Sequence, residues 1–354
     1  MTDSKTNIED LIAIVLKEDA SDLHLSEDRQ PMIRVAGFLV PLLKYPVFSK
    51  ADVKNILSDI IESKKMDEFL DRKELDFAYE YKGSARFRGN AFFQLGRIGI
   101  ALRLIPKKIK TLPELNLPSV LESFINKKQG FFLVVGPTGQ GKSTTLAAMI
   151  DMINERRLEH IITIEDPIEY IFEPKKSLID QREIHQDTMN FESALSSMFR
   201  QDVDVIMIGE MRNAETMATA VTAAETGHLV FSTLHTNTAS QTIARIIDSF
   251  TAEQQNQIRV QLSTSLLGIF SQRLVPRISG GLIPACELLI NNNAVGNLIR
   301  ENRVHEIDTV IETGSAQGMI DLNRYLAELV RTGEISAENA YLNSHNPKNL
   351  EQML

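Results

Sequence analysis

Residues 131–144 read Phe-Phe-Leu-Val-Val-Gly-Pro-Thr-Gly-Gln-Gly-Lys-Ser-Thr and decide the fold. The apolar run 131–135 predicts a buried strand, and residues 136–144 fit the phosphate-loop pattern G-x-x-x-x-G-K-[ST]. Glycines in such a loop let several backbone N–H groups point toward phosphate oxygens. The helix predicted to begin near Lys142 adds its positive N-terminal end. This order of strand, loop and helix predicts a binding site for a nucleoside triphosphate.

Two side chains of the loop have separate expected roles. Lys142 can reach the β- and γ-phosphates, and the hydroxyl of Ser143 can bind Mg²⁺. A nucleoside triphosphate and Mg²⁺ are therefore the expected ligands of the loop. A glycine-rich turn that matches the pattern by chance is the alternative, which the flanking strand and helix disfavour. The predicted nucleotide contacts are Gly136, Pro137, Thr138, Gly139, Gln140, Gly141, Lys142, Ser143 and Thr144.

Composition narrows the class of protein. The 354 residues suit two domains better than one, and the formal net charge of −9 disfavours a nucleic-acid motor with a broadly basic surface. With Cys286 as the single cysteine, neither an intrachain disulfide nor a multi-cysteine zinc site can form. Neither a membrane-spanning run nor the apolar core of a signal peptide occurs, so we expect a cytoplasmic protein. Because of its negative charge we expect no nucleic-acid partner.

The first hundred or so residues predict a small α+β unit. A capping box, Ser-Lys-Ala-Asp at 49–52, opens one of its helices. The segment 106–113 contains two prolines and three lysines and is the best candidate for a linker. The predicted elements are helices at 8–16 and 49–61 and strands at 21–26, 32–40, 77–81, 84–94 and 99–104.

Beyond the linker, apolar strands alternate with helices. Their nearly continuous apolar character suits strands buried on both faces of a largely parallel sheet, so an α/β fold is expected. The C-terminal third is expected to be mostly helical. The predicted strands are 131–135, 161–164, 205–208, 229–233 and 283–290.

Acidic residues follow two of these strands. The segment Ile-Thr-Ile-Glu-Asp-Pro-Ile-Glu-Tyr at 162–170 brings Glu165, Asp166 and Glu169 to a strand end, where such folds bind ligands. An acidic loop facing solvent is the alternative interpretation. The strand 205–208 is followed by Glu210, the pattern of a Walker B carboxylate that holds the metal.

Histidines and arginines supply further candidates. His228 and His235 flank the strand 229–233 and lack the spacing of a metal site. Lone histidines are more often ordinary core or surface residues, but their position after the Walker B strand favours a role in sensing the γ-phosphate. Arg88, Arg97 and Arg103 lie in the strands of the N-terminal unit and could act in trans on a neighbour's triphosphate. Ordinary solvated strand arginines are an equally good interpretation.

These motifs, in this order, resemble the secretion ATPase superfamily and, more narrowly, the PilT-type twitching-motility ATPases, which drive type IV pilus retraction. The likeness covers nearly the whole chain. It includes Ser-Asp-Leu-His-Leu-Ser at 21–26, Ala-Arg-Phe-Arg at 85–88 and Asn-Leu-Ile-Arg-Glu at 297–301, which resembles the end of the family motif A-I-R-N-L-I-R-E.

The resemblance implies an architecture and a set of partners. A PAS-like N-terminal domain at 1–105 would be joined by a linker at 106–115 to a RecA-like ATPase domain at 116–354 with a helical C-terminal region. Six such chains would form a ring. The implied partners are the pilus platform protein of the inner membrane and, indirectly, the pilin fibre, with the ring peripheral at the inner face of the cytoplasmic membrane.

The resemblance also implies residue roles. Glu169 would orient or activate the attacking water, and Glu210 would help to hold Mg²⁺. His228 and His235 would form the family's histidine box. The arginines implied to face the nucleotide across a domain or subunit boundary are Arg88, Arg97 and Arg103, with Arg200 as a further candidate.

The sequence departs from the family pattern at three positions. Gln140 replaces a serine of the phosphate loop and is expected to occupy a free position. Asn213 replaces an aspartate of unclear role, and Gly296 replaces an arginine of the late motif, which puts that motif's partner contact in doubt.

Three other functions remain open. Extension or secretion ATPases usually carry a tetracysteine zinc site, which a chain with Cys286 alone cannot form. An accessory retraction ATPase is compatible with the sequence. A nucleotide-binding scaffold without turnover is disfavoured, because all the expected acids are present.

Overall fold

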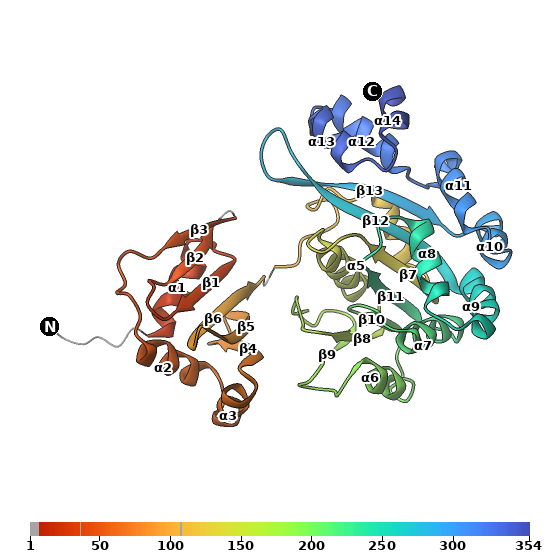
Figure 1. The fold of residues 1–354 in the computed structure, drawn as a ribbon. Helices are drawn as coiled ribbons and strands as arrows, with labels where there is room; N and C mark the ends of the chain where they lie inside the picture. Colours follow the sequence, from red (N-terminus) through yellow and green to blue (C-terminus); the bar gives the residue numbers. More distant parts are fainter. Residues whose placement is uncertain (1–6, 36, 107) are drawn as a thin grey trace. The chain divides into compact units, whose positions relative to one another are not determined.

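A computed structural model describes residues 7–35, 37–106 and 108–354 and divides the chain into two compact units, Met1–Lys108 and Ile109–Leu354 (Figure 1). The division falls inside the segment that the sequence predicts as a linker. Lys107 of that segment lies outside the described residues.

The first unit is an antiparallel six-stranded sheet in the order β3-β2-β1-β6-β5-β4. Residues that alternate along its strands, such as Leu23, Phe87 and Leu102, form a buried core with α1, α2 and α3. Its strands are β1 (Asp22–Ser26), β2 (Met32–Val35), β3 (Phe38–Pro41), β4 (Glu74–Tyr81), β5 (Ala85–Gln94) and β6 (Arg97–Ile105). Its helices are α1 (Ile8–Lys17), α2 (Lys50–Ile60) and α3 (Ser63–Arg72).

Two predictions for this unit are wrong. The single strand expected at 32–40, of which Ala36 lies outside the described residues, is the hairpin β2–β3. Gly37 has a φ of +88°, a conformation that glycine adopts without strain, so the chain can turn back there. The helix α3 was missed although Met66, Phe69 and Leu70 have helical spacing, because these three are its only apolar residues and Phe69 alone is buried. The predicted capping box of Ser49 and Asp52 is confirmed.

The second unit is built on a seven-stranded sheet in the order β13-β12-β7-β11-β10-β8-β9. All neighbouring pairs are parallel except the hairpin β12–β13, which confirms the largely parallel α/β fold. The strands are β7 (Gly130–Val135), β8 (His160–Glu165), β9 (Leu178–Glu183), β10 (Val205–Ile208), β11 (Leu229–Leu234), β12 (Leu266–Pro276) and β13 (Leu282–Ile290).

Helices cover both faces of this sheet. Phe132 and Val134 of β7 share a core with α5, whereas Phe131 and Leu133 face the core formed with α6, α7, α8 and α9. The helices are α4 (Glu122–Ile125), α5 (Lys142–Arg156), α6 (Phe191–Met198), α7 (Ala214–Glu225), α8 (Ala239–Asp248), α9 (Ala252–Ser265), α10 (Asn293–Arg300), α11 (Ile307–Thr313), α12 (Leu322–Arg331), α13 (Ala337–Asn343) and α14 (Pro347–Met353).

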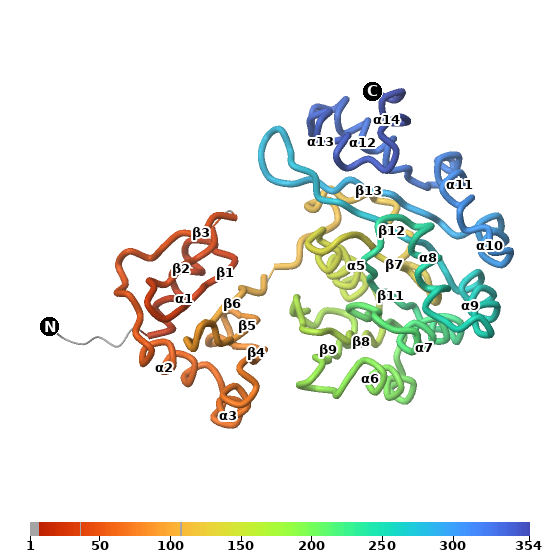
Figure 2. Tube along the Cα trace, viewed as in Figure 1, coloured from red at the N-terminus to blue at the C-terminus, as the bar shows by residue number. Residues whose placement is uncertain are grey.

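The C-terminal part of the chain contains a β-hairpin as well as helices. After the hairpin β12–β13 the chain runs through α10 and α11 into α12, α13 and α14 (Figure 2). Leu326 and Ala340 of these last helices pack against Val275 and Ile283 of the hairpin. The C-terminal helices therefore rest on the same strand, β12, that lies beside β7.

The sequence missed β9 and β12. Both contain several polar residues, Asp-Gln-Arg-Glu in β9 and Ser-Gln-Arg in β12, which interrupt the apolar run that marks a buried strand.

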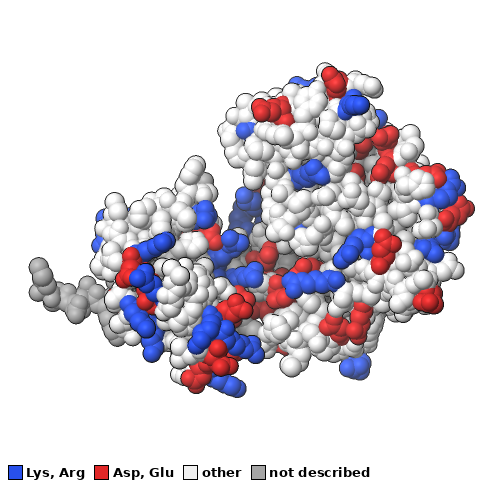
Figure 3. All heavy atoms as spheres, in the orientation of Figure 1, with Lys and Arg blue, Asp and Glu red and all other residues white. Residues whose placement is uncertain are grey.

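On the face drawn in Figure 3, basic and acidic side chains are mixed over both units. No helix among the described residues has the length and apolarity to cross a bilayer.

The core around β7 makes a prediction for stability. Phe132 is fully buried. The centroid of its ring lies 4.3 Å from the ring centroid of Phe124 and 6.0 Å from that of Phe231. Phe132→Ala is expected to lower the free energy of unfolding by about 3–5 kcal/mol, because it removes these contacts and leaves a cavity. Urea unfolding followed by circular dichroism measures the change. The control Leu158→Ala removes a side chain that is 84% exposed and should change stability by about 0.5 kcal/mol at most. Equal effects of the two substitutions would contradict this packing.

Candidate functional site

The candidate site lies at one edge of the second sheet. Because β7, β8, β10 and β11 are parallel, their carboxyl ends meet at the same edge. The phosphate loop follows β7, Glu165 ends β8, Glu210 follows β10 and His235 follows β11. The structure thus brings together motifs that are dispersed along the chain, at the edge where open α/β sheets bind their ligands.

The start of the phosphate loop is shaped by close contact with β12. Gly136 has a φ of +146°, and a Cβ placed on it would lie 2.4 Å from the backbone oxygen of Gln272. No side chain fits there, so glycine is required by both backbone conformation and space. Gly141, with a φ of +78°, precedes the first residue of α5 and allows the turn into the helix.

Lys142 is the buried cation of the site. It is 7% exposed, and its Nζ donates hydrogen bonds to the backbone oxygens of Gly136 (2.8 Å) and Pro137 (2.9 Å). Burial lowers the pKa of the Lys142 ammonium, while the nearby Glu210 and Glu169 raise it. The amino group is therefore held inside the loop, where a phosphate oxygen would be a stronger, charged acceptor than the two carbonyls.

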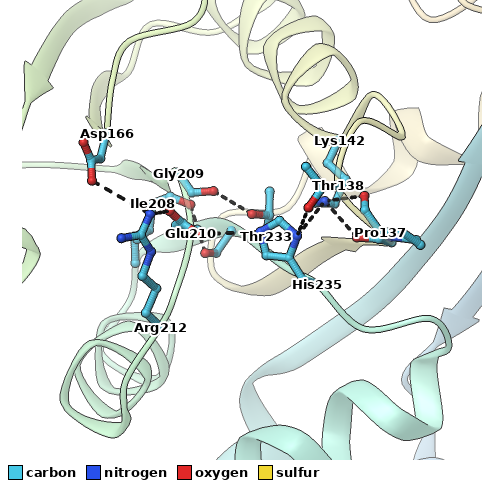
Figure 4. A network of polar contacts seen from close by, with 12 residues as sticks. Pro137, Thr138, Lys142, Asp166, Ile208, Gly209, Glu210, Arg212, Thr233 and His235 are labelled. Carbon is cyan, nitrogen blue, oxygen red and sulfur yellow. Dashed lines mark hydrogen bonds and ion pairs between the residues drawn. The ribbon is translucent and has the colours of Figure 1, made fainter. Parts of the chain in front are cut away.

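His235 lies between Lys142 of the phosphate loop and Glu210, the acid after β10 (Figure 4). Its Nδ1 is 3.3 Å from the hydroxyl of Thr138 and 3.4 Å from Nζ of Lys142. Its Nε2 is 3.5 Å from Oε2 of Glu210. The imidazole thus contacts both the phosphate loop and the acidic residue after β10, which is the placement expected of a residue that senses bound phosphate.

The turn after β10 is tied to its surroundings by two residues that the sequence did not single out. Arg212 forms an ion pair with Glu210 and lies 3.9 Å from Asp166 (Figure 4). The hydroxyl of Thr233 donates to the backbone oxygen of Gly209 (2.7 Å). The contacts of Arg212 with Asp166 and of Thr233 with Gly209 join segments far apart in sequence, so no local pattern could have revealed them.

The acidic loop after β8 lies beside the phosphate loop. The hydroxyl of Tyr170 is 2.8 Å from that of Thr144. Glu169 is exposed, and its negative charge raises the pKa of Lys142. Glu165 is 6% exposed, accepts a hydrogen bond from the backbone N–H of Glu169 (3.3 Å), and has its pKa raised by burial to about 7. Glu165 therefore supports the loop from beneath, and Glu169 is the exposed acid.

Two oxygen donors of the site suit a magnesium ion. Ser143 is the second residue of α5, and Glu210 follows the end of β10. A hydroxyl and a carboxylate are hard oxygen ligands of the kind that Mg²⁺ prefers. Glu210 also acts electrostatically on Lys142, which places it in the same site as the phosphate loop.

Some predicted residues do not reach this loop within the unit. His228 precedes β11, so it lies at the opposite edge of the sheet, where its ring packs edge-on against Phe199 (5.6 Å). Arg200 is exposed after α6, and its guanidinium donates to the backbone oxygen of Ser196 (3.4 Å). His228 and His235 thus lie at opposite ends of β11, as their positions on either side of the strand predict, and the histidine box that the family resemblance implies is not one cluster within this unit.

The predicted arginines of the first unit lie on exposed strand positions. Arg103 of β6 forms an ion pair with Asp22 (2.9 Å), and Arg97 forms one with Asp28 (2.9 Å). Arg88 of β5 is exposed and stands directly opposite Arg103 in the sheet register. Their action on a neighbour's nucleotide stays a prediction.

Gln140 is not the free position that the sequence suggested. Its side-chain oxygen accepts a hydrogen bond from the backbone N–H of Leu274 (2.6 Å). Gln272, 2% exposed and missed by the sequence analysis, donates to the backbone oxygen of Gln140 and accepts from the hydroxyl of Thr145 (2.7 Å). The phosphate loop is therefore fastened to β12 by side chains on both partners.

The other two departures from the family pattern also have a structural role. Asn213 caps α7 by accepting from the backbone N–H of Thr216 (2.9 Å) and donates to Glu192 (2.7 Å), a donation that an aspartate could not make. Gly296 is buried, and a Cβ there would lie 3.2 Å from the backbone oxygen of Ser263, so α9 and α10 pack closely at this point.

Comparisons with known proteins place this geometry in context. The family model described as type II/IV secretion system protein matches residues 4–317. The type IV pilus retraction ATPase PilT of Pseudomonas aeruginosa is 46% identical over 97% of this chain and 99% of its own length. The type IV pilus ATPase PilU of the same organism is 40% identical over 98% and 91%. A crystal structure of the pilus retraction motor PilT with bound ADP superposes with a TM-score of 0.93, at 43% identity over 98% of this chain and 99% of that one.

The contact at Gly136 makes a prediction for nucleotide affinity. Gly136→Ala is expected to weaken ADP binding at least about tenfold, because the added methyl forces the loop away from β12 and strains its backbone. Gly139→Ala is the matched control: its φ is +78°, but a Cβ there meets nothing within 4 Å, so the loss should be smaller. Calorimetric titration with ADP measures both. Equal losses would show that the approach of β12 does not shape the loop.

Proposed function

Since this chain belongs to the type II/IV secretion system protein family, we propose that it is an ATPase that powers type IV pilus retraction. One observation carries the proposal: the chain matches a pilus retraction ATPase over nearly the whole length of both proteins. The contact of His235 with both Lys142 and Glu210 supports it, because the phosphate-binding end and the acidic end of the site are joined.

The phosphate loop would bind the triphosphate through its backbone N–H groups and Lys142. On binding, Nζ of Lys142 exchanges the backbone oxygens of Gly136 and Pro137 for phosphate oxygens. Ser143 and Glu210 would hold Mg²⁺, which neutralises charge on the phosphates. His235, in contact with Thr138 and Lys142, is placed to respond to the presence of the terminal phosphate.

Hydrolysis requires a water in line with the bond that breaks. Glu169 would orient this water and accept its proton as the oxygen attacks the γ-phosphorus and the bond to the β–γ bridging oxygen breaks. Its backbone N–H is fixed by Glu165 (3.3 Å), and its loop is joined to Thr144 through Tyr170 (2.8 Å). Positioning and electrostatic stabilisation account for most of the catalysis in such a site.

Assembly would complete the site. We expect a homohexameric ring in which arginines from the N-terminal unit of one chain stabilise charge on a neighbour's nucleotide. The candidates are Arg88, Arg97 and Arg103. We also propose His228 and Arg200, which lie outside the phosphate loop, as residues that contribute to hydrolysis in the ring. The ring would act at the inner face of the cytoplasmic membrane on the pilus platform protein and, through it, on the pilin fibre.

An accessory retraction ATPase is the second candidate. The chain is 40% identical to PilU, against 46% to PilT of the same organism, so the main retraction ATPase is favoured. Extension ATPases are disfavoured by the absence of a tetracysteine site, since Cys286 is the one cysteine of the sequence.

The residue roles predict two inactive variants. Lys142→Ala and Glu169→Ala are each expected to lower ATP turnover by at least about 100-fold, because one loses phosphate binding and the other the group that activates water. Phosphate release by the purified, folded variants measures this. Glu173→Ala, which removes an exposed acid of the same loop, should keep turnover close to that of the unaltered protein. Near-normal turnover in folded Lys142→Ala or Glu169→Ala would refute the assignment.

The direction of the motor predicts a cellular phenotype. Cells that lack this chain are expected to carry surplus surface pili and to show no twitching, because fibres are built and not withdrawn. Electron microscopy of pili together with a twitching assay provides the measurement. Loss of pili would instead identify an extension ATPase, and preserved twitching would favour an accessory role.

A further inference from the structure

The strand β9 carries polar side chains to which the mechanism above assigns no role. Glu183, at its end, is 5% exposed, and Gln181 is half-buried. The parallel register pairs Gln181 with Thr163 and Glu183 with Glu165 of β8. Two buried carboxylates therefore end neighbouring strands directly beneath the loop that bears Glu169.

These side chains hold the backbone of that loop at successive points. Oε2 of Glu183 accepts from the backbone N–H of Ile168 (3.2 Å), just as Glu165 accepts from that of Glu169. Gln181 accepts from the backbone N–H of Phe172 (2.9 Å) and donates to the backbone oxygen of Tyr170 (2.7 Å). The loop on both sides of Glu169 is thus fixed by side chains of the sheet.

The supporting side chains are themselves held in place. The hydroxyl of Thr163 (2.7 Å) and the amide of Gln181 (3.3 Å) both donate to Oε1 of Glu165. Glu183 accepts a hydrogen bond from the side-chain amide of Gln186. Burying carboxylates costs free energy, which hydrogen bonds only partly offset. Such a costly arrangement suits a loop whose position has to be accurate.

We propose that Glu165, Gln181 and Glu183 form a cradle that positions Glu169 beside the terminal phosphate. They are positioning residues, because each acts through the loop backbone and not on the substrate. The same loop also contacts the phosphate-loop motif, through the hydroxyls of Tyr170 and Thr144. It is therefore held by the sheet and by the nucleotide-binding segment. The inference rests on the proposed role of Glu169.

Substitutions at Glu183 test the cradle. Glu183→Ala removes the acceptor of the Ile168 N–H and is expected to lower kcat for ATP about tenfold or more, while the Kd for ADP changes by about twofold at most, since the phosphate loop is untouched. Glu183→Gln keeps an acceptor oxygen and should restore most of the lost kcat. Phosphate release gives kcat, and calorimetry gives the Kd for ADP.

Asn154 provides a matched control for loss of structure. It is fully buried and holds the far end of the same loop, donating to the backbone oxygen of Glu173 (2.8 Å) and accepting from the N–H of Lys175 (3.1 Å). Asn154→Ala should lower the Tm about as much as Glu183→Ala yet leave kcat within about twofold, because it lies away from Glu169. If Glu183→Ala does not fold, Gln181→Ala replaces it, with the same expected fall in kcat.

The possible results separate this inference from the function on which it rests. Normal kcat in Glu183→Ala, an equally low kcat in Glu183→Gln, or an equal fall in Asn154→Ala would each overturn the cradle. In all three cases a low turnover of Glu169→Ala would leave the proposed function standing. Normal turnover of Glu169→Ala would overturn both.

Discussion

The nucleotide site depends on an ammonium group that is buried against two backbone carbonyls. Lys142 is 7% exposed and is satisfied by the oxygens of Gly136 and Pro137 before any phosphate arrives. A buried cation without such partners would cost several kcal/mol. The loop therefore curls tightly enough to turn the carbonyls of Gly136 and Pro137 toward its own lysine.

That curl is supported by β12, which also supports the C-terminal helices. Gln272 approaches Gly136 and bonds to Gln140 and Thr145, while Val275 and Ile283 of the hairpin pack against α12 and α13. The phosphate loop and the C-terminal helices thus both contact strand β12.

Local patterns were enough to predict the parts of the site that are contiguous in sequence. The loop at 136–144, the acids after β8 and Glu210 after β10 could be read directly, because strand, turn and acid follow one another along the chain. Contacts between distant segments could not: Gln272 and Thr145 are separated by 127 residues, and the polar strands β9 and β12 lack the apolar run that identifies a buried strand. The positions of His228 and His235 on either side of one strand predicted that they lie near its opposite ends, and the structure has them so; only the family resemblance grouped them as one histidine box.

We propose that phosphate binding and hydrolysis occur at the two ends of one site, which His235 joins through its contacts with Lys142 and Glu210. Glu210→Gln is the sharpest test, because Glu210 contacts His235, whereas the phosphates are expected to be held by Lys142 and the backbone of the loop. ADP affinity and single-turnover phosphate release are measured on the same preparation. In Glu210→Gln, ADP binding should be largely kept while phosphate release is lost. Phosphate release at the normal rate would contradict it.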